Sequence, residues 1–180
     1  MVGAQSAAAQ RSKPADDYGI YDAALKAVVG GDKRTQMSIV RFTALTEDGV
    51  GDCLDKASST PQWKSVVADL RQRNVVPRTL ESRFGLPFKY EMADELEVVG
   101  GARVGPPGQD RRAFLAEQAE KLERMERMHY VQVQLSVPGV SSDGLRSIVY
   151  VAVSYAGVFI GLRKKDARWV EAREVCRWIS

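Results

Sequence analysis

Histidine and cysteine are scarce in this sequence. Among its 180 residues there is one histidine, His129, and there are two cysteines, Cys53 and Cys176. A zinc site would have to recruit all three, together with a carboxylate, from far-apart positions with no clustered spacing. A Cys–His nucleophilic pair would require proximity in the fold, because neither cysteine lies near His129 in the sequence. We therefore predict no metal site and no cofactor.

Long apolar runs and a large excess of one charge are also missing. No window approaches the ~18 consecutive apolar residues that a bilayer-spanning helix requires, so we predict no membrane span. The 26 Lys and Arg residues nearly balance the 23 Asp and Glu residues, which leaves a net charge of +3. Nucleic-acid-binding domains usually cluster their cations, whereas Arg and Glu interleave here. A nucleic-acid partner is therefore disfavoured, and a protein partner or a homo-oligomer stays open.

The N-terminal stretch MVGAQSAAAQRSKPADD is rich in small and polar residues. We predict a disordered tail over residues 1–15 and a single domain over residues 16–180, long enough to bury one core. The tail is typical of a segment just downstream of a processing site, so we expect an exported protein, periplasmic or secreted, that has lost a signal peptide. A cytoplasmic protein with a disordered N-terminus is the alternative. Export would allow Cys53 and Cys176 to form a disulfide, whereas in the cytosol both would be small buried side chains.

Apolar residues recur at helical spacing in three segments. DDYGIYDAALKAVVGG has a capping aspartate before its apolar stripe and two glycines after it. Residues 61–74 begin with a proline after Thr60, and their apolar face consists of Trp63, Val66, Val67 and Leu70. Residues 111–130 contain three ion pairs of the favourable acid-first i,i+4 type. Their apolar stripe, which includes Leu115, favours packing on a sheet over a coiled-coil or oligomer contact.

The last third of the chain changes to an alternation of period two. The stretches VQVQLSV, RSIVYVAVSYAG, VFIGLRKK and RWVEAREVCRWIS each predict a strand, with turn signals at Ala156-Gly157 and Lys165-Asp166-Ala167. QMSIVRFTAL predicts an earlier strand, residues 46–60 predict a loop, and a short helical turn is expected near Asp94–Val98. Helices mostly before strands predict an α+β fold, with helices packed on one face of an antiparallel sheet that ends in a four-strand meander.

Two motifs suggest chemistry without completing a site. GGARVGPPG lacks the Gly-Lys-Ser/Thr ending of a phosphate loop, and its prolines remove backbone donors, so we interpret it as a connector. EMADELE places Glu91, Asp94 and Glu95 close together, without the spacing of an EF-hand. A solvated acidic face is the simpler interpretation. Together with His129, these carboxylates are nevertheless the candidates for a hydrolase-like enzyme.

A basic triplet, Arg163-Lys164-Lys165, precedes the turn between the last two predicted strands, and Arg168 follows it. Turns need polar residues, and charges discourage pairing at a sheet edge, so a solvated turn is the first interpretation. Trp169 and Trp178 have opposite parities in the final strand, so only one can face the core unless a bulge intervenes. The other would be covered by a helix or partly exposed, and an exposed tryptophan is a candidate for contact with a partner. The candidate binding residues are therefore Trp169, Trp178, Arg163, Lys164 and Lys165.

The chain ends with the stretches IVYVAVSYAGVFIGL, KKDARW and RWIS, which are a long apolar strand, a glycine-containing strand, a basic hairpin and a terminal Trp-Ile-Ser. Upstream, VVADLRQRNVVPRTLESRFGLPFKY combines a helix with an Asn-x-x-Pro segment. Together these stretches resemble a family of uncharacterised bacterial proteins, often exported, that end in a Trp-Ile-Ser strand. The resemblance covers roughly residues 20–180. It implies a bacterial, exported protein and carries no activity or catalytic residue.

No catalytic constellation is assembled in this sequence, although its fold is well specified. We therefore predict a non-enzymatic, exported binding or interaction domain. The competing hypotheses are the hydrolase-like enzyme with scattered carboxylates and His129, and a cytoplasmic regulator that contacts nucleic acid through the basic hairpin.

Overall fold

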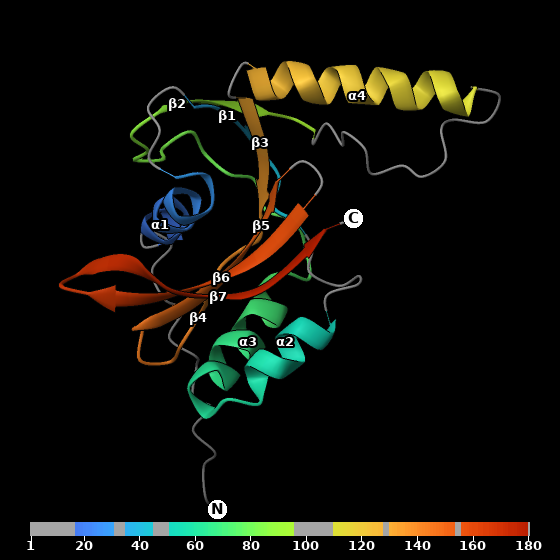
Figure 1. Cartoon of the computed structure of the whole chain (residues 1–180). Helices are drawn as coiled ribbons and strands as arrows, with labels where there is room; N and C mark the ends of the chain where they lie inside the picture. Colours follow the sequence, from blue (N-terminus) through green and yellow to red (C-terminus); the bar gives the residue numbers. More distant parts are fainter. Residues whose placement is uncertain are drawn as a thin grey trace, which may run out of the picture.

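The computed structural model describes residues 17–30, 35–44, 51–95, 110–127, 130–153 and 156–179, and the predicted N-terminal tail lies outside these ranges. Figure 1 shows how the helices and strands are arranged. The helices are α1 (Asp17–Val29), α2 (Gly51–Ser58), α3 (Pro61–Arg73) and α4 (Arg111–Arg127). The strands are β1 (Gln36–Val40), β2 (Lys89–Ala93), β3 (Tyr130–Leu135), β4 (Gly139–Val140), β5 (Arg146–Val153), β6 (Ala156–Lys165) and β7 (Arg168–Ile179).

The strands form one mixed sheet in the order β2-β1-β3-β5-β6-β7, and the short β4 pairs with β5. β3, β5, β6 and β7 are antiparallel neighbours, so the predicted α+β class and the C-terminal four-strand meander are confirmed. β1 is parallel to both β2 and β3, which the sequence did not lead us to expect. The sheet is therefore antiparallel only over its C-terminal part.

Helices cover both faces of the sheet. In β5, Val149 and Val151 belong to the hydrophobic cluster around α1, whereas Ile148 and Tyr150 belong to the cluster around α2 and α3. In Figure 1, α1 accordingly lies on one side of the sheet and α2 with α3 on the other. The prediction that the helices pack on a single face is wrong, because the continuous apolar run of β5 is buried on both sides.

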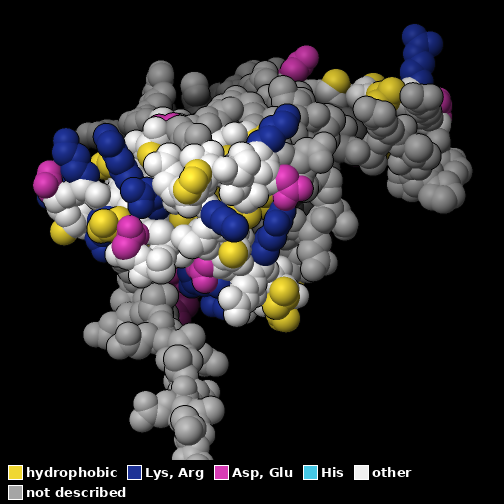
Figure 2. Space-filling model, turned by 90° about the horizontal axis from the view of Figure 1, so that it is seen from below, with side chains coloured by type: hydrophobic (Ala, Val, Ile, Leu, Met, Phe, Trp, Pro, Cys, Tyr) yellow, Lys and Arg dark blue, Asp and Glu magenta, His cyan; other side chains and the backbone are white. Residues whose placement is uncertain are grey.

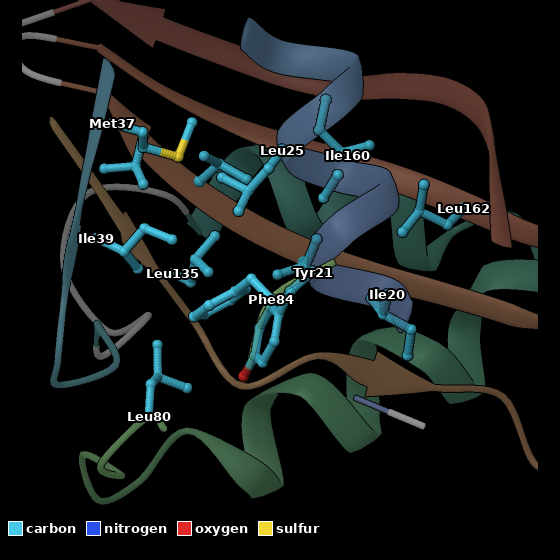
Figure 3. Packing of buried hydrophobic residues seen from close by; sticks show 14 of the residues in the cluster. Ile20, Tyr21, Leu25, Met37, Ile39, Leu80, Phe84, Leu135, Ile160 and Leu162 are labelled. Carbon is cyan, nitrogen blue, oxygen red and sulfur yellow. The ribbon is translucent and has the colours of Figure 1, made fainter. Parts of the chain in front are cut away.

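The cluster on the α1 face is the larger of the two. Ile20, Tyr21, Ala24 and Leu25 of α1 are buried, and Gly30 ends the helix with φ of +80°. Figure 3 shows Ile20, Tyr21 and Leu25 packed over the sheet, and the segment after α3 adds Phe84 and Leu80 to the same cluster. The predicted stripe of the first helix is therefore confirmed as its core face. The strand side chains in this cluster include Met37, Ile39, Leu135, Ile160 and Leu162.

A polar contact fastens α1 to the segment that follows α3. Both carboxylate oxygens of Asp22 accept a hydrogen bond from the Gly85 N–H at 2.9 Å. Burial raises the pKa of the Asp22 carboxyl, and the Gly85 hydrogen bond opposes that shift. A Cβ atom at Gly85 would lie 2.8 Å from Asp22 Oδ2, so this contact depends on glycine.

The opposite face is covered by α3, whose buried residues are the four predicted: Trp63, Val66, Val67 and Leu70. Beyond its last turn, the buried Asn74 amide donates to the carbonyls of Leu70 and Val137 and accepts from the Val137 N–H, each at 2.7 Å. A Cβ atom at Gly139 would collide with the Val66 carbonyl oxygen. The close approach at Gly139 and the Asn74 bonds together fix α3 against the link between β3 and β4.

Two local predictions are wrong in the segment before the meander. α2 occupies part of the predicted loop over residues 46–60, and its buried Leu54 and Ala57 are too few to create a visible period. β2 ends at Ala93. Asp94 and Glu95 were expected to begin a helical turn, but they are not helical. The rest of that predicted helical turn, residues 96–98, lies outside the described residues. β2 pairs in parallel with a distant strand, so no hairpin turn marks it in the sequence.

α4 is helical as predicted, but the described residues of its predicted apolar stripe do not pack on the sheet. Leu115 is 50% exposed and Ala119 is exposed, so this part of the stripe is not a core face. α4 contacts β3 and extends away from the sheet in Figure 1. Its sequence forms a helix without burial because good helix formers and i,i+4 ion pairs support it locally, as between Glu120 and Arg124. Of the helices described above, none has the length and hydrophobicity to cross a membrane.

Candidate functional site

The basic triplet lies at the end of a tight hairpin. Asp166 and Ala167 link β6 to β7, and both have positive φ angles, of 49° and 63°. Two consecutive residues with positive φ make the turn type that matches the twist of a two-stranded ribbon. The predicted turn at Lys165-Asp166-Ala167 is therefore confirmed, and its geometry fixes the register of the flanking strands.

This register places like charges directly opposite one another. Arg163 of β6 is the cross-strand partner of Arg146 of β5, and Lys165 is the partner of Arg168 in β7. Strand alternation puts all four on the face that carries Ile148 and Phe159, which is the face covered by α3. We call Arg146, Arg163, Lys165 and Arg168 the cationic stripe. Figure 2, a view from below, shows Lys and Arg side chains among hydrophobic and acidic ones at the left end, where Figure 1 places this hairpin.

Edge protection does not account for the whole stripe. β7 is the last strand of the sheet, so Arg168 can discourage pairing with another chain. Arg146 and Arg163 lie in β5 and β6, which have neighbours on both sides. Like charges directly opposite in a sheet are destabilising, by roughly 0.2–1 kcal/mol for a pair. The interpretation as a solvated turn concerns the triplet and Arg168, and it does not cover Arg146 of β5, which lies opposite Arg163.

The third member of the triplet is on the other face. The Lys164 ammonium lies 5.4 Å from the centre of the Trp169 ring, its cross-strand partner, in a cation–π contact. Trp169 is 8% exposed and belongs to the α1-side core, so it is a core residue and not an exposed contact residue. Two irregularities in the β6–β7 register intervene between the tryptophans, but each adds one residue to β7, so together they leave the opposite parities of the two positions unchanged. The side chain of Trp178 lies outside what the structure describes.

A short turn holds Arg146 in place. Asp143 accepts hydrogen bonds from the Ser141 hydroxyl and from the Leu145 N–H, and these bonds lower the pKa of its carboxyl. Arg146 also donates to Asp143 at 3.2 Å, with the two side chains 36% and 47% exposed. An ion pair this exposed contributes little to stability. Asp143 therefore mainly shapes the turn.

A hollow of about 390 Å³ opens beside the stripe. Its walls come from the first turn of α3, from the turn before β5, and from β6 and β7; the lining residues are Gln62, Trp63, Leu145, Arg146, Arg163, Lys164 and Ala172. The Lys164 N–H donates to the Leu145 carbonyl at 2.8 Å, and the Lys164 ammonium lies over the Trp169 ring. Leu145 is 51% exposed at this hollow. The site thus combines apolar surface with two guanidinium groups.

The carboxylates proposed for an enzyme do not converge within the described structure. Glu91 accepts a hydrogen bond from the Tyr130 hydroxyl at 3.3 Å, and Asp94 pairs with Arg41 at 3.1 Å on the exposed surface. Glu95 is exposed, and His129 lies outside the described residues. Among the residues that the structure describes, no three His, Cys, Asp or Glu side chains are grouped so as to hold a metal ion.

Cys176 in β7 is disulfide-bonded. The sequence contains one other cysteine, Cys53, whose position falls in α2. α2 contacts β7 in the fold, so the two chain segments are neighbours.

Sequence reasoning found Arg163, Lys165 and Arg168 but missed Arg146, Leu145 and the role of the first turn of α3. Arg146 carries no local signal, because only the β5–β6 register brings it opposite Arg163. Comparison of the chain with protein-family models, with curated proteins and with solved structures finds no match.

Proposed function

We propose that this protein is a non-enzymatic binding domain that docks an acidic protein partner through the cationic stripe. The observation that carries the proposal is the strand register, which places Arg146 opposite Arg163 and Lys165 opposite Arg168. Among the described side chains, no acidic group forms an ion pair with Arg163, Lys165 or Arg168. A carboxylate-bearing partner would relieve the repulsion, which gives this arrangement a use.

An acidic protein fits the stripe better than nucleic acid does. The stripe contains two cross-strand pairs, one between β5 and β6 and one between β6 and β7, whereas sequence-independent DNA binding commonly uses about 6–10 phosphate contacts. The net charge of the chain, +3, gives no broader positive field. Exposed Leu145 beside Arg146 also suits a protein surface, where apolar and charged groups alternate.

The docking surface can be located by titrating isotope-labelled protein with a probe peptide. The probe is a dodecapeptide of alternating Glu and Ser. The amide chemical shifts of the protein are recorded during the titration, at low and at physiological salt. We expect the shifts to cluster at residues 143–147 and 163–170 and to weaken with salt. Shifts centred on another surface, such as the β2 edge, would contradict the proposal. So would tighter binding to a short duplex DNA at physiological salt.

We also propose that the protein is exported, periplasmic or secreted. The disulfide at Cys176 supports this, because disulfides persist in oxidising compartments and are rare in the cytosol. This support can be tested by producing the protein in an oxidising and in a reducing compartment. The free thiols and the stability of the two samples are then compared. We expect no free thiol and full stability only in the first case. Equal stability of the reduced protein would remove this support for export.

A further inference from the structure

We infer that the hollow beside the cationic stripe receives one large apolar side chain of the partner, so that the recognised segment is an apolar residue flanked by carboxylates. This inference rests on the proposed function and names the chemistry of the segment that the same surface recognises. It comes from the composition of the hollow, which is apolar on one side and cationic on the other.

The apolar side consists of Leu145, Trp63 and Ala172. Leu145 is 51% exposed, and it is the one large hydrophobic side chain of such exposure that lines this hollow in the described structure. Trp63 is 3% exposed and is held in the core beneath α3, so this wall is rigid. Ala172 lies within the register irregularity between β6 and β7, and its small side chain leaves the space open.

The volume of about 390 Å³ lies in the range of small-ligand pockets, and it can hold one apolar side chain. A buried apolar anchor surrounded by a polar rim is the usual anatomy of a protein–protein hot spot. The rim here is cationic, with Arg146 and Arg163 lining the hollow and Lys165 and Arg168 continuing along the ribbon. Carboxylates on both sides of the anchor would meet these guanidinium and ammonium groups.

Edge pairing by an incoming strand is a poorer explanation of this surface. β7 is interrupted by two register irregularities, between Phe159 and Ile160 and between Gly161 and Leu162 of its partner strand. Bulges in an edge strand discourage the addition of another strand. The partner therefore contacts the face of the ribbon rather than its edge.

Three labelled dodecapeptides test the inference by fluorescence anisotropy at physiological salt. One alternates Glu and Ser, the second has a single central Leu in place of Ser, and the third keeps this Leu but has Gln for every Glu. We expect the Leu-containing acidic peptide to bind about tenfold more tightly than the Glu–Ser peptide, and the Gln peptide to bind least.

Two variants locate the anchor. Leu145→Ser removes the apolar rim, and Ala172→Gln fills the hollow without changing charge; both should remove most of the preference for Leu. Leu115→Ser is the matched control, because Leu115 on α4 has nearly the same exposure, 50%. Its binding should equal that of the unmodified protein.

The outcomes separate this inference from the proposed function. Equal binding of the two acidic peptides, or equal effects of Leu145→Ser and Leu115→Ser, would overturn the apolar anchor while the acidic partner stands. Absence of binding by both acidic peptides would overturn the proposed function as well.

Discussion

The repulsion between Arg146 and Arg163 can be measured directly in the free protein. The perturbation is a double-mutant cycle of Arg146→Gln, Arg163→Gln and the double variant, with unfolding by urea at low and high salt. Asp143 is present in all four proteins, so its contact with Arg146 cancels from the coupling energy to first order.

The expected coupling follows from the cross-strand register. Two unit charges about 7 Å apart, at an effective dielectric constant of about 60, repel by about 0.8 kcal/mol. At an ionic strength of about 0.01 M the Debye length is about 30 Å, so most of this repulsion remains; at about 1 M it is about 3 Å, and roughly a tenth remains. Each single variant should therefore gain stability from loss of the repulsion at low salt, and this gain should disappear at high salt.

The sign of the coupling energy shows whether Arg146 and Arg163 repel each other in the free protein. A coupling energy of zero at low salt, or an attractive one, would show that the two guanidinium groups do not oppose each other. The structural basis of the proposed docking surface would then be lost. A repulsive coupling that fades with salt identifies a pair that lowers the stability of the free protein, which is typical of functional sites.

Three further predictions concern the framework of the site. Asn74→Ala should lower the free energy of unfolding by about 2–4 kcal/mol, because it leaves buried partners at Leu70 and Val137 unpaired; urea unfolding measures this, and a loss below about 0.5 kcal/mol would contradict it. Burial raises the folded-state pKa of Asp22, so its favourable contribution is present below the unfolded pKa and is lost as the pH rises through the folded one. The unfolding free energy of Asp22→Asn relative to the unmodified protein should therefore increase between about pH 3.5 and pH 7, and a constant or falling difference would refute this. Cys176→Ser should lower stability by up to about 4–5 kcal/mol if Cys53 closes the long loop with it, and urea unfolding without reductant that shows no loss would exclude such a cross-link.

The C-terminal meander could be predicted because its signals are local. Alternation of period two defines each strand, and the turn at Asp166 and Ala167 follows from short polar spacing. The stripe of α3 was equally readable, since four apolar residues repeat at helical spacing after Thr60-Pro61. Each of these features depends on residues a few positions apart, which is the range over which periodicity is informative.

The pairing of distant segments was not readable in the same way. β2 reaches β1 across more than 40 residues and in parallel, so no turn in the sequence announces it. Ala156 and Gly157 were predicted to form a turn, but they begin β6, and Val153 pairs with Ala156. That register places Arg146 opposite Arg163. A turn centred at Ala156-Gly157 would have given Arg146 a different partner in β6.

The candidate residues illustrate the same limit. Arg163 and Lys164 are adjacent in the sequence, yet alternation sends one toward the hollow and the other over the Trp169 ring. Strand alternation predicted that Trp169 and Trp178 lie on different faces of the sheet. Only the packing of the α1-side cluster identifies Trp169 as a core residue. The cationic stripe is therefore a property of strand register and not of the basic triplet.

The central claim is that the cationic stripe binds an acidic partner because of where its charges lie and not because of how many there are. The most direct test compares two double variants that lose the same charge, Arg146→Gln with Arg163→Gln, and Lys56→Gln with Lys89→Gln at exposed positions elsewhere. Affinity for the acidic, Leu-containing dodecapeptide is measured at physiological salt. We predict that the first variant loses at least about tenfold in affinity while the second stays within about twofold of the unmodified protein. Equal losses in the two variants would contradict the account.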